Sequence, residues 1–115
     1  KEDMLRAARD IIALGAKSVL MKGGHLQDSA DDLLYDGIDA IWFTGERINT
    51  KNTHGTGCTL SSALAANLAL GLSLPEAVKI SKNYITTAID NALDIGSGCG
   101  PTHHFVNLYR KAGLL

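Results

Sequence analysis

A helix that leads through a short turn into a short, mainly apolar strand is the feature that most limits how this chain can fold. Over residues 3–14, apolar side chains recur at helical spacing, and Gly15 stands where a helix C-terminal glycine is expected. Residues 18–21 follow with no polar alternation, which is typical of a central parallel strand covered on both faces. Helix, turn and buried strand in this order predict an α/β protein.

A β-hairpin is expected after this strand. Asp36-Gly37 separates two apolar segments, residues 32–35 and residues 38–43, and Asp-Gly is a strong signal for a two-residue hairpin turn. We interpret the pair as an antiparallel excursion at the edge of an otherwise parallel sheet. Residues 44–54 are polar and rich in turn formers, so they predict a loop.

Two helices are predicted beyond that loop. Residues 56 to about 70 are rich in Ala and Leu, with leucines at intervals of four. Ser73 and Glu76 have the spacing of a capping box that opens a second helix, which extends to about Leu93. A glycine-rich stretch then ends regular structure, and residues 105–115 are expected to hold a short final helix.

Composition narrows the classes of function. The 115 residues are 45% hydrophobic, and 11 Lys and Arg against 12 Asp and Glu give a net charge of −1. This balance offers no electrostatic basis for general nucleic-acid or membrane-surface binding. No apolar run approaches the roughly 18 residues of a spanning helix. With 2 cysteines and no signal segment at its start, the chain is expected in the cytoplasm.

Residues 52–59, Asn-Thr-His-Gly-Thr-Gly-Cys-Thr, carry the most chemical information. They form a glycine-containing turn that runs directly into a predicted helix. The first amides of a helix have no intrahelical acceptor, and the macrodipole places partial positive charge there. Gly55 and Gly57 lack Cβ, so a ligand can approach the backbone closely. We therefore expect an anion cradle, most naturally for phosphate, at Gly55, Thr56, Gly57 and Cys58.

Cys58 is the candidate for chemistry inside that turn. A helix N-terminus favours the thiolate form of a cysteine, which takes a proton from a hydroxyl or attacks carbon. Thr56 and Thr59 add hydroxyl donors for a phosphate oxygen. A plainer interpretation stays open, because a Gly-x-Gly before a helix is common and a free cysteine is often only a small buried hydrophobe.

Lys22 is the second candidate. It follows the apolar strand and precedes Gly23-Gly24, so it is expected at the strand's carboxyl end, where ligands bind in open α/β sheets. Its ammonium there can meet a nucleotide phosphate, and the alternative is a solvated surface lysine. The 4 histidines and 2 cysteines show no metal-ligand spacing, so no protein metal site is expected.

These motifs resemble those of the hydroxymethylpyrimidine/phosphomethylpyrimidine kinases of thiamine biosynthesis, a family of the ribokinase-like superfamily. The likeness includes Lys22-Gly23-Gly24-His25, residues 52–59 and the Gly-Cys-Gly-Pro-Thr-His-His-Phe segment at residues 98–105, and it covers nearly the whole chain. Gly-Thr-Gly-Cys at residues 55–58 is specific, because most sugar kinases of the superfamily carry Gly-Ala-Gly-Asp there.

The resemblance implies an α/β, three-layer ribokinase-like fold with a mostly parallel sheet, an antiparallel hairpin and flanking helices. Residues 1–115 correspond to the C-terminal, ATP- and phosphate-side part of such a domain, and the N-terminal substrate half is absent. By resemblance, Cys58 takes the position of the sugar-kinase aspartate as the base. The amides of Gly55, Thr56, Gly57 and Cys58 form the anion hole, and Lys22 contacts phosphate.

The resemblance also implies ATP-dependent, Mg²⁺-dependent phosphorylation of 4-amino-5-hydroxymethyl-2-methylpyrimidine and its monophosphate by the full-length protein. The isolated piece is expected not to turn over, and relatives commonly pair, so a homodimer is a further expectation. Pyridoxal or pyridoxine kinase activity is the nearest alternative, because those substrates are also flat heteroaromatics bearing a hydroxymethyl group. A non-catalytic nucleotide-binding module and a hydrolase with Cys58 as nucleophile are the other two.

Overall fold

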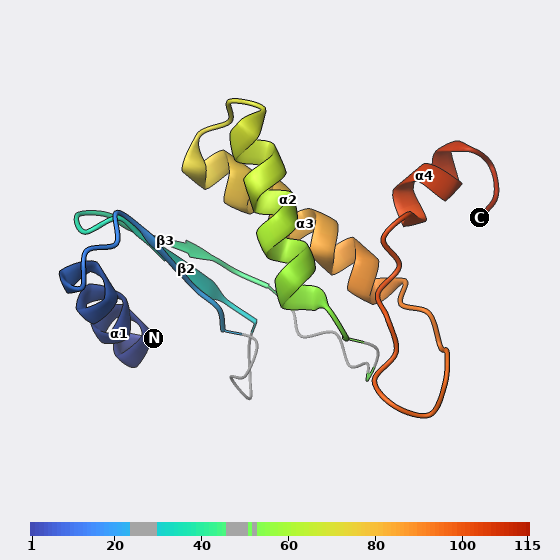
Figure 1. Cartoon of the computed structure of the whole chain (residues 1–115), viewed down its shortest axis with the longest axis horizontal. Coiled ribbons are helices and arrows are strands. Elements are labelled where there is room, and N and C mark those ends of the chain that lie inside the picture. The colour runs from blue at the N-terminus through green and yellow to red at the C-terminus, as the bar shows by residue number, and fades with distance from the viewer. Residues whose placement is uncertain (24–29, 46–50, 52) are drawn as a thin grey trace. The chain divides into compact units, whose positions relative to one another are not determined.

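The computed structural model describes residues 1–23, 30–45, 51 and 53–115, which fall into two compact units, residues 1–47 and residues 48–115. The first unit holds one helix and three strands, and the second holds three helices. In chain order the elements are α1 (Glu2–Ala13), β1 (Val19–Met21), β2 (Asp32–Tyr35), β3 (Ala40–Phe43), α2 (Thr56–Ala69), α3 (Leu74–Asp90) and α4 (Val106–Lys111) (Figure 1).

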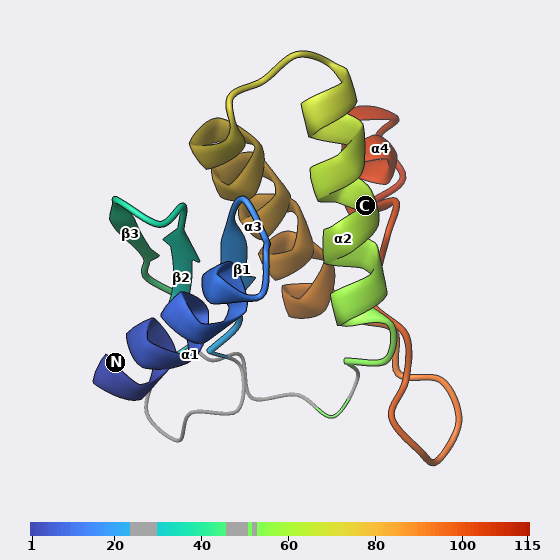
Figure 2. The same cartoon turned by 60° about the vertical axis from the view of Figure 1, so that its left-hand side comes forward.

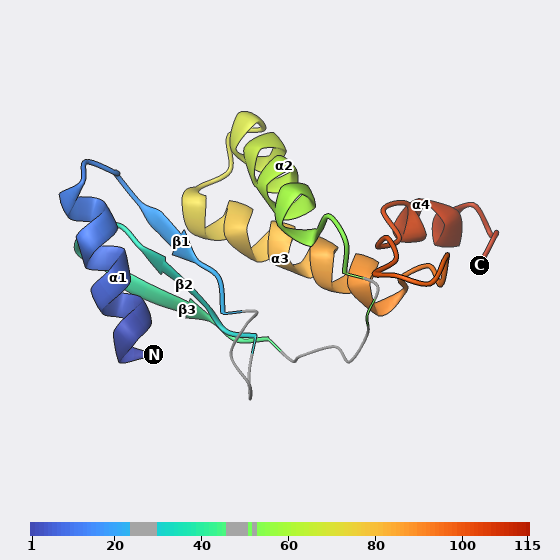
Figure 3. The same cartoon turned by 60° about the horizontal axis from the view of Figure 1, so that its bottom comes forward.

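Helix α1 packs against the sheet of the first unit through one apolar face (Figure 3). Ala8 on α1, Val19 on β1 and Leu33 on β2 form the buried centre of this contact. Partly buried side chains surround it: Met4, Leu5, Ile12, Ala16, Met21, Tyr35 and Trp42. Gly15, with φ of 111°, follows the end of the helix, as its position in the sequence predicts.

The sheet of the first unit has the order β1-β2-β3, and both strand pairings are antiparallel. The expectation of a mostly parallel sheet with a central parallel strand at residues 18–21 is therefore wrong for the described strands. The connections explain the difference. Only residues 22–31 and residues 36–39 separate the paired strands, whereas parallel neighbours need a crossover of about a dozen residues or more. An unbroken apolar run indicates burial but does not fix the direction of the neighbouring strand.

The β2–β3 hairpin is confirmed, but its turn is centred one residue later than the sequence predicts. The Asp36 N–H donates to the Asp39 carbonyl at 3.3 Å, so Gly37 and Ile38 are the central residues. Gly37 has φ of 93°, and glycine is favoured at the first central position of such turns. Asp36 Oδ1 accepts from the amides of Asp39 at 2.7 Å and Ile38 at 2.9 Å. These hydrogen bonds hold the pKa of Asp36 below its ordinary value, and the bond from the Asp39 amide has the larger effect.

Helices α2 and α3 pack against each other in the second unit (Figure 2). Helix α3 begins as predicted, with Ser73 as N-cap accepting the Glu76 amide at 3.4 Å. Inside the helix pair, the Asn67 side-chain amide donates to the hydroxyl of the fully buried Ser81 at 3.0 Å. The residues that the unit buries are mostly small or apolar: Leu60, Ala77, Val78, Ser81, Ile85, Ala88, Thr102 and Val106, with Gly100.

The chain beyond α3 folds back along that helix before α4. The His103 N–H donates to the Ala88 carbonyl at 2.9 Å, and the Tyr84 hydroxyl donates to the His104 carbonyl at 2.8 Å. The short helix α4, which the sequence predicts within residues 105–115, follows; Val106 is its buried residue, and the rest of the helix is exposed. Among the described residues, none of the helices combines the length and the apolar character that crossing a bilayer requires.

Candidate functional site

The turn at residues 55–58 opens helix α2, as the sequence predicts. Gly55 is the N-cap with φ of 78° and ψ of 8°, a left-handed conformation that L side chains rarely adopt. Thr56, Gly57 and Cys58 form the first turn of the helix. Among the residues that the structure describes, no side chain caps this terminus. The bend therefore depends on backbone conformation alone, and the glycine at position 55 is what permits it.

The amides of this turn divide into engaged and available donors. The Thr56 N–H donates to the Thr53 carbonyl at 3.3 Å, and the Thr59 N–H makes the first helical bond to the Gly55 carbonyl at 2.9 Å. Within the described part of the chain, the amides of Gly55, Gly57 and Cys58 have no acceptor. The turn thus keeps three backbone donors at the positive end of a 14-residue helix.

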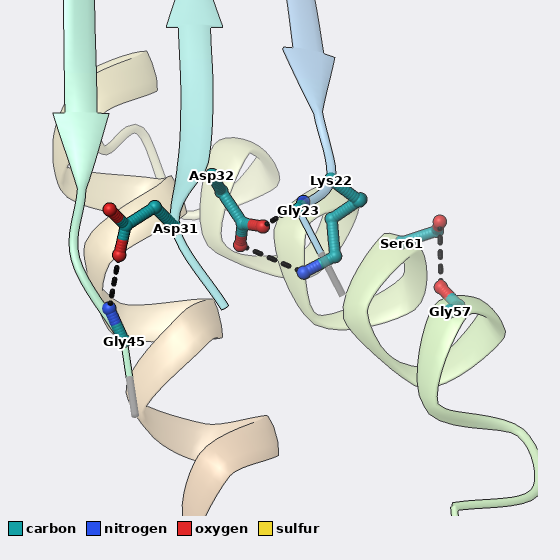
Figure 4. Close-up of polar contacts among 7 residues, drawn as sticks. All are labelled: Lys22, Gly23, Asp31, Asp32, Gly45, Gly57 and Ser61. Carbon is teal, nitrogen blue, oxygen red and sulfur yellow. Dashed lines mark hydrogen bonds and ion pairs between the residues drawn. The ribbon is translucent and has the colours of Figure 1, made fainter. Parts of the chain in front are cut away.

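The two glycines of the turn have open space on the side where a Cβ would point. A Cβ built on Gly55 or Gly57 would meet no atom of the described residues within 4 Å. The Cys58 side chain is exposed. The Gly57 carbonyl of the turn accepts a hydrogen bond from the Ser61 hydroxyl at 2.9 Å (Figure 4). An anion can therefore reach the available amides without displacing a side chain of this turn.

A second segment is held beside the turn by backbone pairing. His54 and Pro101 form an isolated parallel bridge, and the His54 N–H donates to the Gly100 carbonyl at 3.1 Å. The Pro101 carbonyl in turn accepts from the Leu93 N–H at 3.1 Å. The glycine-rich stretch that ends regular structure after α3 is therefore tied to the residue before Gly55. Sequence reasoning gave this stretch no place near the cradle, because no local pattern connects residues so far apart.

Lys22 lies directly after β1, at the strand's carboxyl end, as predicted. Its Nζ is 2.8 Å from Asp32 Oδ2, while the Gly23 N–H donates to Asp32 Oδ1 at 2.9 Å (Figure 4). The Asp32 side chain is 1% exposed and that of Lys22 is 46% exposed. Lys22 is therefore neither a buried residue nor a simple solvated one: its ammonium is paired on one side and reachable on the other.

Asp32 is the residue that sequence reasoning missed. The available signal was an acidic residue at the start of the apolar run Asp32-Leu33-Leu34, where a charge is costly unless it is paired. Its neighbour Asp31 accepts from the Gly45 N–H at 3.2 Å and lies 3.2 Å from Lys1 Nζ. Both carboxylates therefore hold the ends of strands in the first unit.

The structure places the predicted site residues in two units. Lys22 belongs to the first and Gly55, Thr56, Gly57 and Cys58 belong to the second. Three residues of the sequence motifs, Gly24, His25 and Asn52, lie outside the described residues. Across the ranges that the structure describes, no three His, Cys, Asp or Glu side chains gather as a metal site would require.

Comparison with known proteins places the chain in a family. Residues 1–103 match the family model of phosphomethylpyrimidine kinase. The hydroxymethylpyrimidine/phosphomethylpyrimidine kinase of Rhizobium meliloti is 51% identical over 106 residues, which cover 90% of this chain and 40% of that protein. The Streptomyces coelicolor enzyme of the same name is 47% identical over 102 residues, covering 89% and 38%. The chain spans about two fifths of the length of these relatives.

Solved structures agree with the sequence relatives. An ADP complex of Bacillus subtilis pyridoxal kinase has a TM-score of 0.87 and 41% identity, covering 93% of this chain and 41% of that one. Staphylococcus aureus pyridoxal kinase with AMP-PCP and pyridoxal has a TM-score of 0.85 and 39% identity, covering 90% and 40%. Phosphomethylpyrimidine kinase of Clostridium difficile has a TM-score of 0.61 and 44% identity, covering 76% and 34%. The predicted α/β, ribokinase-like fold class is confirmed.

Proposed function

This chain belongs to the phosphomethylpyrimidine kinase family, and on that premise we propose an activity for the full-length protein that contains it. That protein transfers a phosphoryl group from ATP to 4-amino-5-hydroxymethyl-2-methylpyrimidine and to its monophosphate. Residues 1–115 supply its C-terminal, ATP- and phosphate-side part, and an N-terminal part supplies the contacts to the pyrimidine. The uncapped glycine turn that opens α2 is the observation that carries the proposal. We place this protein in the cytoplasm and propose that it forms a homodimer.

The available amides at the start of α2 receive the charge of the transferred phosphoryl group. Phosphoryl transfer requires little covalent chemistry from the protein, so positioning and charge stabilisation dominate catalysis. Donors of this kind lower the barrier by roughly 2.7–4 kcal/mol each when an oxyanion develops beside them. Glycine at position 57 costs about 1 kcal/mol of helix stability relative to alanine. Since no atom of the described residues lies within 4 Å of a Cβ built there, we infer that close approach of a ligand is the physical reason for glycine at this position.

Cys58 receives the proton of the acceptor alcohol. The hydroxymethyl oxygen attacks the γ-phosphorus, the bond from that phosphorus to the bridging oxygen breaks, and ADP leaves with the bond's electron pair. The alcohol proton passes to the sulfur of Cys58, which lies in the first turn of α2. The exposure of Cys58 in the first helical turn supports this role. The hydroxyls of Thr56 and Thr59 are further donors for phosphate oxygens.

Lys22 acts as a point charge on an ATP phosphate. Its half-exposed side chain at the end of β1 supports this assignment. Mg²⁺ enters with ATP as the companion ion of the phosphates. The residues that the structure describes form no cluster suited to hold it, so we assign the ion to no residue of this chain.

Pyridoxal is the second candidate substrate. Two of the three solved structures compared above are pyridoxal kinases, and they match this chain with the higher TM-scores. Pyridoxal and the pyrimidine share a flat heteroaromatic ring with a hydroxymethyl group, so the phosphate-side residues serve either alcohol. The choice between them depends on the N-terminal part. Residues 1–115 alone are a nucleotide-binding fragment without turnover.

The test is steady-state phosphorylation by the full-length protein with ATP and either alcohol. The pyrimidine is expected to give the higher kcat/KM. Cys58→Ala is expected to lower kcat by about 10²–10⁴-fold, the usual contribution of a general base, with a much smaller change in KM for ATP. Cys99→Ala is the matched control, because Cys99 is also a free, exposed thiol, and its kcat is expected to stay at the wild-type value.

Two results would contradict this proposal. Phosphorylation of neither alcohol by the wild-type protein would overturn the activity itself. Wild-type turnover in Cys58→Ala would instead remove Cys58 from the proton transfer and leave the amides and Lys22 as the catalytic groups. Accumulation of an acyl-enzyme on Cys58 with an activated ester, detected by intact-mass spectrometry, would favour a hydrolase.

A further inference from the structure

We propose that Asp32 is a positioning residue that holds Lys22 in the geometry for phosphate contact. The proposal rests on the proposed function, because Lys22 is the group that meets the nucleotide. Asp32 is 1% exposed, so it acts through Lys22 and not on the substrate.

The carboxylate of Asp32 binds the Lys22-Gly23 segment at two points. Oδ2 lies 2.8 Å from Lys22 Nζ, and Oδ1 accepts from the Gly23 N–H at 2.9 Å (Figure 4). One oxygen therefore fixes the side chain of the candidate residue while the other fixes the backbone that follows it. Because the two bonds share one planar carboxylate, the position of the ammonium relative to the chain is determined.

The backbone packing around Gly23 restrains the same segment. A Cβ at Gly23 would collide with the carbonyl oxygen of Asp31, so only glycine fits where the two chain segments meet. Asp31 directly precedes Asp32, and Asp32 begins β2. The entry of β2 therefore contacts the exit of β1 through backbone and side chain together, and Lys22 stands on a rigid support.

The ammonium of Lys22 keeps capacity for a second partner. It has three N–H donors, one of which is directed at Asp32. Its side chain is 46% exposed, in contrast to the buried carboxylate. A lysine side chain loses rotamer freedom when a ligand orders it, and an ion pair that has already ordered it removes part of that cost. Asp32 thus supplies preorganisation without covering the charge.

A double-mutant cycle in the full-length protein tests this role. Lys22→Met is expected to lower kcat/KM for ATP by about 10²-fold, as loss of a charge-stabilising donor does. Asp32→Asn keeps an acceptor for the Gly23 amide but turns an N–H₂ toward the ammonium. It is expected to lower kcat/KM by about 10-fold or more through misplacement of Lys22. The double variant is expected to have the kcat/KM of Lys22→Met alone, because the proposed effect of Asp32 on ATP use passes through Lys22.

Asp36→Asn is the matched control. Asp36 also accepts two backbone amide hydrogens in the first unit, but both belong to the hairpin turn, and Asp36 follows the end of β2 opposite to Asp32. Its kcat/KM is expected to stay within about 2-fold of wild type. If the fold-losses in kcat/KM of the two single variants multiply in the Lys22→Met/Asp32→Asn double variant, Asp32 contributes independently of Lys22. That result would overturn the proposal.

A second readout separates this proposal from the kinase activity. Acylation of lysines in the nucleotide-free, full-length protein is followed by peptide mass spectrometry. Asp32→Asn is expected to raise the labelling rate of Lys22 several-fold, with the exposed Lys17 as internal reference. Faster Lys22 labelling in a protein that phosphorylates neither alcohol would sink the kinase function and keep the positioning role. An unchanged labelling rate would overturn the positioning role.

Asp32→Glu keeps the negative charge and is the alternative variant if Asp32→Asn does not fold. Asp32→Glu retains the ion pair but moves the carboxylate by one methylene, so Lys22 is displaced. Folded Asp32→Glu, verified by circular dichroism, is expected to lose about 10-fold in kcat/KM with Lys22 labelling still slow. Wild-type kcat/KM in this folded variant would contradict the proposal.

Discussion

The two regions proposed to meet phosphate are built by opposite means. In the first unit, a charged side chain stands at a strand end, held by the buried Asp32 and by the packing of Gly23. In the second unit, Gly57 and Cys58 offer backbone amides at a helix start that none of the described side chains caps. A fixed cation needs an internal counter-charge, whereas an amide cradle needs a permitted backbone conformation and empty space before it.

One buried polar residue in each unit, Asp32 and Thr102, differs in its hydrogen bonding, although the second unit also buries Ser81, whose hydroxyl accepts from Asn67. Asp32 is 1% exposed, and both of its oxygens have partners. Thr102 is also 1% exposed, but its hydroxyl has no hydrogen-bond partner within the described ranges. The first unit thus satisfies a buried charge, while the second leaves a buried hydroxyl unsatisfied, which costs free energy.

The largest expected effect comes from replacing one glycine in each unit with alanine. Gly23→Ala forces a Cβ into the Asp31 carbonyl and is expected to lower the free energy of unfolding by about 3 kcal/mol. The methyl group of Gly57→Ala meets no atom within the described ranges, so the free energy of unfolding is expected to hold or rise by up to about 1 kcal/mol while kcat/KM falls. Urea denaturation and ATP kinetics of the full-length variants measure both quantities. Equal stability losses in the two variants would contradict the comparison.

The left-handed N-cap gives the next effect. Gly55→Ala places a Cβ at φ of 78° and is expected to cost about 1–2 kcal/mol of unfolding free energy. Gly55→Asn is expected to recover part of that loss, because asparagine tolerates this conformation. Both values come from urea denaturation. An unchanged unfolding free energy in Gly55→Ala would mean that the turn does not require glycine, and the cradle would lose its conformational basis.

Thr102→Val tests the unsatisfied hydroxyl. Replacing a buried hydroxyl that lacks a partner with a methyl of similar volume is expected to raise the unfolding free energy by about 1 kcal/mol. Thr86→Val is the control, since Thr86 is exposed on α3 and is expected to change stability by less than about 0.5 kcal/mol. A loss of stability in Thr102→Val would show that the hydroxyl is hydrogen-bonded in the full-length protein.

The smallest expected effect is the loss of stability at acid pH that comes from Asp36. The pKa of Asp36 is lower in the folded chain than its usual value because the Asp39 and Ile38 amides donate to it. Its contribution is therefore complete above the unfolded pKa of about 3.9 and is lost as pH falls through the lower folded pKa. The urea midpoint of wild type is expected to drop more between pH 5 and pH 2 than that of Asp36→Asn. Parallel pH profiles would contradict this assignment.

Local patterns predicted the helices and the hairpin. Ser73 and Glu76 defined the start of α3, and Gly15 marked the end of α1. The turn register was wrong because the Asp36 side chain organises the residues after it, which makes Gly37 the first central position. Helix α3 ends at Asp90, before the expected Leu93, where the following chain turns back.

Contacts between residues distant in the chain could not be predicted from local sequence patterns. The pairing direction of β1 depends on the length of its connection to β2, which an apolar run does not encode. The Lys22–Asp32 pair joins two residues ten positions apart that only the fold brings together. The glycine turn was identified because helix-start chemistry is local: Gly55 and Cys58 are found where their neighbours in the sequence predict.

The most direct test of the account follows the backbone amides of the full-length protein by ¹⁵N–¹H NMR during titration with AMP-PCP and Mg²⁺. The account predicts large shifts and slowed hydrogen exchange at Gly57 and Cys58, as their free N–H groups acquire phosphate oxygens. Saturation that shifts other amides but leaves those two at their nucleotide-free positions would contradict it.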